Sequence, residues 1–173
     1  MRYNKIRRTD ISNGPGIRVS IFMQGCTFNC KGCFNPETHD FTGGHEFNDA
    51  VIDKIMNLAS PKYIKGLSIL GGEPMHAKNI DGTLKLVHEF KKKYPTKDVW
   101  VWTGFNYEDL SKAHDLSEID VLVDGQYKME LYNPTLKYRG SSNQRVIDIK
   151  KTIKNKKIEI LEGVTVWDKE DLK

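Results

Sequence analysis

The chain has 173 residues and three cysteines, and all three, Cys26, Cys30 and Cys33, lie in one short segment. That segment follows Arg18–Gln24, a nearly continuous apolar run that predicts a β-strand ending at Gly25. Three closely spaced cysteines exclude the paired framework of a disulfide-rich domain. The fold must therefore present three thiols in one loop at the carboxyl end of a strand, and a single common site is their simplest role.

Beyond the cysteines, strand and helix patterns alternate along the chain. Apolar residues three or four apart predict helices, and short apolar runs that end in glycine predict strands. The predicted elements are a helix over 46–59, a strand over 67–70, a helix ending near 94, a strand over 98–103, a short helix over 107–114 and a strand over 119–123. Segments 145–150 and 157–166 are candidates for further strands. This alternation is typical of an α/β fold with a parallel sheet, in which sites lie at the carboxyl ends of the strands.

We expect a single domain over residues 1–173, because this length supports one sizeable core rather than two. No apolar stretch approaches the roughly 20 residues that cross a bilayer. The basic N-terminal segment is not followed by the apolar region of a secretion signal. We therefore expect a cytoplasmic protein without a membrane segment.

The formal net charge of +4 arises mostly from lysines clustered at 91–93 and 150–157. Blocks of like charge are usually solvated surface, and we interpret both clusters in this way. Nucleic-acid binding is a weaker alternative, because aromatic side chains are not interleaved with these lysines in a pattern suited to base stacking. Nucleic acid is therefore not an expected partner.

The gaps between the cysteines are three and then two residues, so a tight loop can bring three thiolates to one metal cluster. An iron–sulfur cluster usually takes four thiolates, and three protein ligands leave one iron open for a substrate or cofactor. One alternative is a structural zinc site of the Cys3His type that includes His39. A reactive or redox-sensing thiol is another, although it uses at most two of the three sulfurs.

The cysteine spacing at the end of a first strand resembles the signature of the radical S-adenosylmethionine superfamily. This resemblance implies a [4Fe–4S] cluster on Cys26, Cys30 and Cys33, S-adenosylmethionine at the open iron, and a partial (β/α) barrel of mostly parallel strands. In that superfamily, reductive cleavage of the cofactor gives a 5′-deoxyadenosyl radical that abstracts hydrogen from a chosen carbon. The cofactors carry the chemistry, so no catalytic residue is expected beyond the cluster ligands. The remaining histidines at or beside helical positions are assigned to surface or core: His76, His88 and His114.

The segment Gly71–Pro74 follows the second predicted strand and, by itself, is an ordinary turn. Together with the cysteines it resembles the Gly-Gly-Glu motif of the superfamily. The resemblance implies that Gly72 and Glu73 contact the ammonium group of S-adenosylmethionine, which suits a carboxylate and backbone that a ligand can approach closely.

Three residues of the cysteine loop, Gly32, Cys33 and Phe34, are placed against the cofactor by the same resemblance, with the ring of Phe34 near the adenine. Simple packing of Phe34 in the core is the alternative. The segment Trp102–Phe105 ends the third predicted strand and is a candidate to line the adenosine, although an aromatic pair around a turn explains it equally well.

Four further segments, in the same order, resemble the activating proteins of anaerobic ribonucleoside-triphosphate reductases. They are 10–18, 99–104, 121–125 and 139–144. The resemblance extends to about Asp148, and the lysine-rich extension 149–173 lies outside it. It implies that the partner is the reductase, that a glycine α-carbon of the reductase loses a hydrogen atom, and that a flavodoxin-like protein donates electrons. The alternatives are a superfamily enzyme that acts on a small molecule and a zinc-binding adaptor.

The loop departs from the family at three positions. Phe28, Phe34 and His39 stand where histidine, tyrosine and tryptophan are common. None of these positions is a cluster ligand, so the assignment of the three cysteines is unaffected.

Overall fold

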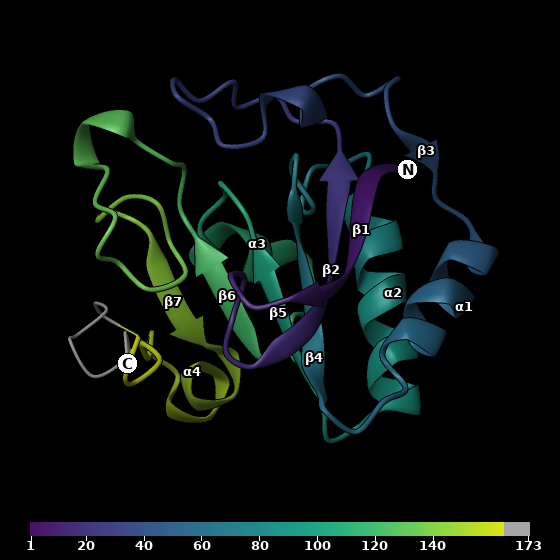
Figure 1. The fold of residues 1–173 in the computed structure, drawn as a ribbon. Helices are drawn as coiled ribbons and strands as arrows, with labels where there is room; N and C mark the ends of the chain where they lie inside the picture. The colour runs from purple at the N-terminus through teal and green to yellow at the C-terminus, as the bar shows by residue number, and fades with distance from the viewer. Residues whose placement is uncertain (165–173) are drawn as a thin grey trace.

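A computed structural model describes residues 1–164, which form one mixed sheet in the strand order β3-β1-β2-β4-β5-β6-β7 (Figure 1). The central strands β2, β4, β5 and β6 are parallel, whereas β1, β3 and β7 pair antiparallel at the edges. The strands are β1 Arg2–Asp10, β2 Ile17–Gln24, β3 His45–Glu46, β4 Ile64–Gly71, β5 Asp98–Trp102, β6 Val121–Asp124 and β7 Arg145–Asp148. The helices are α1 Asp49–Leu58, α2 Ile80–Lys93, α3 Tyr107–Ala113 and α4 Ile149–Asn155, with short 3-10 helices η1 Pro36–Thr38 and η2 Met129–Leu131.

The α/β class and the parallel core confirm the prediction from the sequence. The edges of the sheet differ from it. Strand β1 was not predicted, because most of its side chains are only partly buried and its sequence therefore lacks a strong apolar alternation. Helix α1 begins at Asp49 rather than at 46, since residues 45–46 form β3.

The C-terminal part also differs from its prediction. The strand expected over 145–150 ends at Asp148, whose side chain accepts a hydrogen bond from Lys151 N and caps helix α4. In the segment 157–166, the described residues contain one isolated bridge, between Ile160 and Ile147, and no strand. Residues 165 and 166 of that predicted strand lie outside the described residues. Within residues 1–164, no helix has both the length and the apolar character needed to cross a bilayer.

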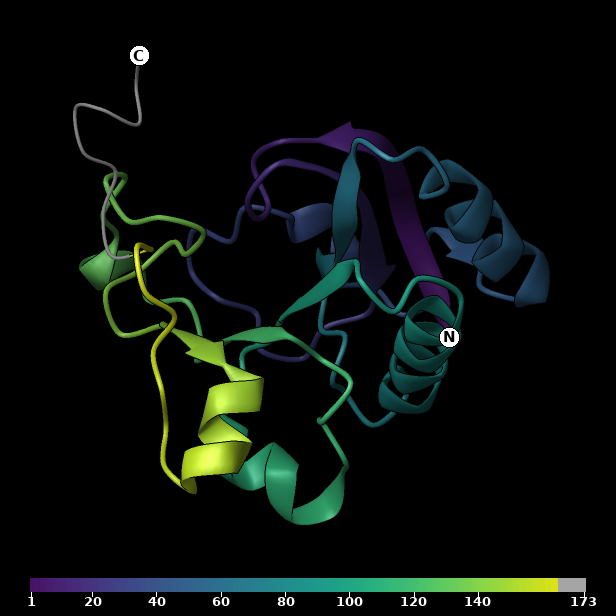
Figure 2. The same cartoon turned by 90° about the horizontal axis from the view of Figure 1, so that it is seen from below.

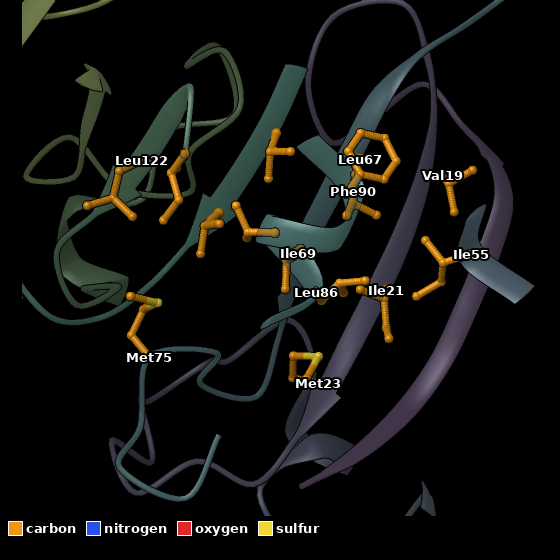
Figure 3. Close-up of a cluster of buried hydrophobic side chains, with 14 of the residues drawn as sticks. Val19, Ile21, Met23, Ile55, Leu67, Ile69, Met75, Leu86, Phe90 and Leu122 are labelled. Carbon is orange, nitrogen blue, oxygen red and sulfur yellow. The ribbon is translucent and has the colours of Figure 1, made fainter. Parts of the chain in front are cut away.

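The main hydrophobic core lies between one face of the sheet and the helices, with α1 and α2 side by side over it (Figures 1 and 2). Strand β2 points Val19, Ile21 and Met23 into this core, where they join Ile55 of α1 and Phe90 of α2 (Figure 3). Side chains two apart on a strand share a face, so this alternation fixes which face of β2 is covered by helices. The opposite face is left for other contacts.

That opposite face carries Arg18, Ser20 and Phe22 of β2, all buried. Phe22 lines a cavity together with Leu70 of β4 and Trp102 of β5. These three residues lie near the carboxyl ends of their strands. The cavity therefore opens at the end of the sheet where the sequence predicts a site. In Figure 1 this is the upper edge, over which the loop after β2 passes.

Each of the two lysine clusters contributes a side chain to an ion pair with Asp120. The Lys91 side chain is only 14% exposed, and its Nζ lies 2.9 Å from Oδ2 of Asp120. The same carboxylate binds Lys150 Nζ at 2.6 Å and accepts a hydrogen bond from Val99 N at 2.8 Å. The interpretation of Lys91 as free surface charge is therefore wrong: a half-buried carboxylate at the start of β6 requires a nearby cation.

At the other end of β6, Arg145 of β7 binds two carboxylates at once. Its Nη1 and Nη2 lie 2.8 and 2.7 Å from the Glu108 oxygens, and its Nε lies 2.9 Å from Oδ1 of buried Asp124. The Arg145 hydrogen bonds are the main cause that lowers the pKa of Glu108 to about 2. The pair therefore joins α3 to the β6–β7 edge.

We expect Glu108→Gln to lower the free energy of unfolding at pH 7 by no more than about 1 kcal/mol, because the Glu108 side chain is 51% exposed. Because the pKa of Glu108 is lower in the folded chain, its ionised carboxylate stabilises the fold at pH values above the pKa in the unfolded chain. This contribution is lost as the pH falls toward the pKa in the folded chain. The difference from the unmodified chain should thus shrink between about pH 4.5 and pH 2. Urea titrations across this range measure it, with Glu130→Gln at an exposed position as the control. A pH-independent difference would contradict the assignment.

Candidate cluster and cofactor site

A cavity of about 770 Å³ opens at the carboxyl ends of β2, β4, β5 and β6. Its wall includes six of the seven predicted site residues: Cys26, Cys30, Cys33, Phe34, Gly72 and Glu73. The segment 102–104 also lines it, as predicted for the end of the third strand, whereas Gly32 does not. The volume falls in the range of roughly 300–1,000 Å³ that is usual for sites of small ligands.

The cysteine loop is closed at its base by hydrogen bonds to a returning segment, 37–40. Gly25 N donates to Thr38 O at 2.7 Å. The buried side chain of Gln24 donates through Nε2 to two carbonyl groups of the segment, at 3.1 and 2.7 Å. Gly25 has a φ of 98°, and a Cβ at this position would overlap the ring of Phe41. The loop is thus held at the end of β2 independently of any bound group.

The three thiols are partly buried in the cavity wall. Burial is the main cause that raises the pKa of Cys26 and of Cys33. Backbone N–H groups act in the opposite direction, and Asn35 N donates to Cys33 Sγ at 3.4 Å. The site therefore offers sulfur ligands together with N–H donors that stabilise negative charge on sulfur.

The distances between the candidate ligands indicate whether a zinc ion or an iron–sulfur cluster fits them better. Within residues 1–164, no three His, Cys, Asp or Glu side chains lie close enough together to hold a single metal ion, although His39 shares the cavity wall with the cysteines. A structural zinc ion needs four ligands converging on one point. In a [4Fe–4S] cluster each thiolate binds a different iron, so the ligands are farther apart. The donor set therefore fits a cluster better than a zinc ion.

Glu73 is fully buried at the end of β4, and three donors of the chain converge on it. Its Oε1 accepts from Thr103 Oγ1 at 2.7 Å and from Met75 N at 2.9 Å, and its Oε2 accepts from Gly104 N at 2.7 Å. Burial raises the pKa of Glu73 to about 7, although the three hydrogen bonds oppose this shift. The carboxylate thus links the ends of β4 and β5, and both of its oxygens already accept hydrogen bonds from the chain.

Glycine is required at position 72 because the backbone at the end of β4 comes very close to the backbone at the start of the cysteine loop. Its N–H donates to Met23 O at 2.9 Å, and the next amide, Glu73 N, donates to Gly25 O at 2.8 Å. A Cβ on Gly72 would lie 2.6 Å from Gly25 O. The second glycine of the motif thus lets the end of β4 pack directly against the start of the cysteine loop.

Phe34 is 62% exposed, so the alternative that it packs in the core is wrong. Its ring centroid lies 5.1 Å from that of Tyr127 and 6.0 Å from that of Tyr132. Gly32 faces the same segment, since a Cβ there would lie 3.0 Å from Sδ of Met129. One side of the cysteine loop therefore contacts residues 127–132, which the sequence did not link to the site.

Two other loops complete the cavity wall. Residues 11–13 lie on one side of it, and residues 133–144 contribute several positions on another, including Arg139, Gly140 and Gln144. Parts of both loops belong to segments that the family resemblance singled out. The stretch 126–134 was missed, and its one local signal is its position directly after the Asp-Gly pair that ends β6.

Comparison with known families agrees with this site. Residues 12–147 match the family model described as a 4Fe-4S single cluster domain. The matched region contains all three cysteines and the carboxyl ends of the four parallel strands. Fold and site thus define the class of the protein, which is that of single-cluster iron–sulfur domains.

The curated relatives narrow the class. The anaerobic ribonucleoside-triphosphate reductase-activating protein of Escherichia coli is 42% identical over 152 residues, which cover 84% of this chain and 97% of the relative. Its counterpart in Vibrio cholerae is 41% identical over 148 residues, covering 83% and 96%. That of Enterobacteria phage T4 is 39% identical over 147 residues, covering 84% and 93%. The chain belongs to the family of anaerobic ribonucleoside-triphosphate reductase-activating proteins.

Proposed function

We propose that Cys26, Cys30 and Cys33 bind one [4Fe–4S] cluster, that the adjoining cavity binds S-adenosylmethionine, and that the chain activates an anaerobic ribonucleoside-triphosphate reductase. The observation that carries this proposal is the position of three thiols in the wall of one ligand-sized cavity at the carboxyl ends of the strands. Family membership supports the partner, since the relatives are named as activating proteins of that reductase.

Cys26, Cys30 and Cys33 would hold the cluster, and the bound cluster together with S-adenosylmethionine would supply one-electron radical chemistry directed at a glycine α-carbon of the reductase. The residues of this chain bind and orient the reactants. We assign Gly72 and Glu73 to the ammonium end of the cofactor, with the backbone as the main contact because three chain donors already use the Glu73 carboxylate. Cys33 and Phe34 are assigned to its adenosine side, whereas Gly32 supports the loop against Met129.

We propose that the reductase docks on a rim of exposed apolar side chains around the cavity mouth. Of the nine large hydrophobic residues that are exposed in the described chain, five belong to this rim: Ile11, Phe34, Met129, Leu131 and Tyr132. Ile11, Phe34 and Tyr132 also line the cavity itself. Exposed apolar groups concentrated around one opening are typical of a protein contact site. A glycine segment held there would be delivered directly to the reactive centre.

The proposed electron donor is an acidic flavodoxin-like protein. Lys31 lies exposed within the cysteine loop, and Lys128 is exposed in the neighbouring segment. Basic side chains next to a cluster favour encounter with a negatively charged donor. Reduced flavodoxin should therefore replace dithionite in the assay described below.

We also propose that residues 1–173 form a single cytoplasmic domain. Strand β1 joins the same sheet as β7, and Ile149 of α4 belongs to the main core, so both ends of the described chain are part of one structure. A cytoplasmic location suits three unpaired cysteines, because that compartment keeps thiols reduced.

The test is an anaerobic mixture of the reconstituted protein, dithionite, S-adenosylmethionine and an anaerobic ribonucleotide reductase. We expect the doublet of a glycyl radical in the electron paramagnetic resonance spectrum, together with 5′-deoxyadenosine. Leu131→Asp should lower the yield of radical about five- to thirty-fold at limiting reductase, because a polar group left without a partner in an apolar contact costs about 1–2 kcal/mol or more.

Formation of 5′-deoxyadenosine without reductase should be unchanged in this variant. The matched control is Ile153→Asp, which changes an equally apolar exposed residue on α4. Equal radical yields from the two variants would rule out the rim as the docking surface. Cofactor cleavage without any doublet, in the unmodified protein, would show that the substrate is not the reductase.

A further inference from the structure

The side chain of Gln126 contacts the cysteine loop. Its Nε2 lies 3.5 Å from Cys30 Sγ and 3.4 Å from Phe28 O. Both neighbours are acceptors, so the amide must present its NH2 group and not its oxygen to them. Gln126 lies two residues after the end of β6, and the pair brings together positions 96 residues apart in the chain.

Cys33 receives its hydrogen bond from the backbone of the loop itself, since Asn35 N donates to Cys33 Sγ at 3.4 Å. This donor comes with the conformation of the loop. The donor to Cys30 differs, because it is a side chain and can be changed without altering the loop backbone.

The position of Gln126 is fixed by a second set of hydrogen bonds. Asn143 Nδ2 donates to Gln126 O at 2.9 Å, and Gln144 Nε2 donates to Gly125 O at 3.0 Å. Gln144 Oε1 in turn accepts from Gly140 N at 2.9 Å. Two amide side chains of the segment 139–144 therefore hold the backbone from which Gln126 projects, which gives that segment a physical role at the site.

We propose that Gln126 is a positioning residue that donates a hydrogen bond to the Cys30 sulfur and makes the bound cluster easier to reduce. Reduction adds negative charge to the cluster and its sulfurs, and an N–H donor stabilises that charge. The inference rests on the proposed function, because it requires Cys30 to be a cluster ligand. It adds a residue that sets how readily the cluster accepts the electron on which cofactor cleavage depends.

Replacing Gln126 by leucine removes the donor and keeps a side chain of similar size. We expect the equilibrium constant for one-electron reduction of the cluster to fall about tenfold, which corresponds to a midpoint potential about 59 mV more negative. Anaerobic redox titration followed by electron paramagnetic resonance measures this potential. Gln126→Asn, whose amide is one methylene shorter and no longer reaches Cys30, should show a similar shift. Thr27→Val, at an exposed position of the same loop, is the matched control and should leave the potential unchanged.

If the variants do not bind a cluster, a measurement on the unmodified chain still tests the hydrogen bond from Gln126 to Cys30. The chain contains three glutamines, Gln24, Gln126 and Gln144, so ¹⁵N can be placed in their side-chain amides alone. Electron–nuclear double resonance of the reduced cluster should then show a ¹⁵N coupling through the hydrogen bond. No coupling, or an unchanged potential in Gln126→Leu with full iron and sulfide, overturns the inference. Failure of the unmodified chain to bind iron and sulfide at all would instead overturn the proposed function.

Discussion

Single replacement of Cys26, Cys30 or Cys33 by alanine should reduce S-adenosylmethionine cleavage more than about 100-fold. Loss of a residue that only hydrogen-bonds to a metal ligand already lowers metal affinity or activity about 10–100-fold, and loss of a ligand itself should cost more. Each variant loses one of the three thiols of the cavity wall that we propose as cluster ligands. The measurement is 5′-deoxyadenosine formed with dithionite after anaerobic reconstitution, with iron and acid-labile sulfide determined on the same samples.

The loss should not come from unfolding. The thiols are only partly buried, and the loop that carries them is closed by backbone and Gln24 hydrogen bonds that the substitutions leave intact. The free energy of unfolding of the metal-free variants should therefore stay within about 1 kcal/mol of the unmodified chain. An alanine variant that keeps both its cluster and its cleavage activity would remove that cysteine from the ligand set.

His39→Ala separates the cluster from the zinc alternative. A Cys3His zinc site needs this histidine as its fourth ligand, whereas a cluster with three thiolates does not. We expect the variant to retain iron and sulfide in full. Zinc in the anaerobically purified chain, lost on this substitution, would contradict the iron–sulfur assignment and favour an adaptor.

Those parts of the fold that depend on local pattern could be predicted from the sequence. The apolar spacing in α2 and the Tyr-Pro pair after it predict a helix that ends near 94, and α2 ends at Lys93. The glycines after β4 and β6 mark strand ends that the structure confirms. Strand β1 has no comparable signal, because only Tyr3 and Ile6 pack, partly buried, against the main core and the strand also depends on antiparallel pairing with β2.

At the site, the sequence points to the three cysteines as candidate ligands but does not predict what surrounds them. The cysteines are close in sequence, so their spacing is informative without a structure. The contacts of Gln126 with Cys30 and of Tyr127 with Phe34 join segments about 90 residues apart, and they depend on how the sheet assembles. The partners of Glu73 could not be predicted for the same reason. The Gly-Gly-Glu motif indicates that Glu73 lies at the site, but its hydrogen bonds come from Met75 and from the end of a different strand.

Arg18 is the largest polar residue among the fully buried side chains, and it links three strands. Its Nε donates to Ser68 Oγ at 2.7 Å, its Nη2 donates to Leu67 O at 2.9 Å, and the same Nη2 pairs with the Asp98 carboxylate. The guanidinium also lies 5.6 Å from the ring of Trp100. Asp98 is therefore the counter-charge that permits an arginine inside the fold, and the pair joins the start of β2 to the start of β5.

Arg18→Ala should lower the free energy of unfolding by about 3–5 kcal/mol, the usual loss when one partner of a buried pair is removed and the other is left uncompensated. Urea denaturation of the metal-free chain measures the change, and Arg8→Ala at an exposed position of β1 should cost less than about 0.5 kcal/mol. Arg18→Met alone also leaves Asp98 uncompensated, so adding Asp98→Asn to it should recover part of the loss. Equal destabilisation by Arg18→Met with and without Asp98→Asn would show that packing, and not the charge pair, is responsible. Because Ser68 Oγ donates to Asn13 O at 2.6 Å, and Asn13 lines the cavity, the folded fraction of Arg18→Ala should also bind S-adenosylmethionine more weakly.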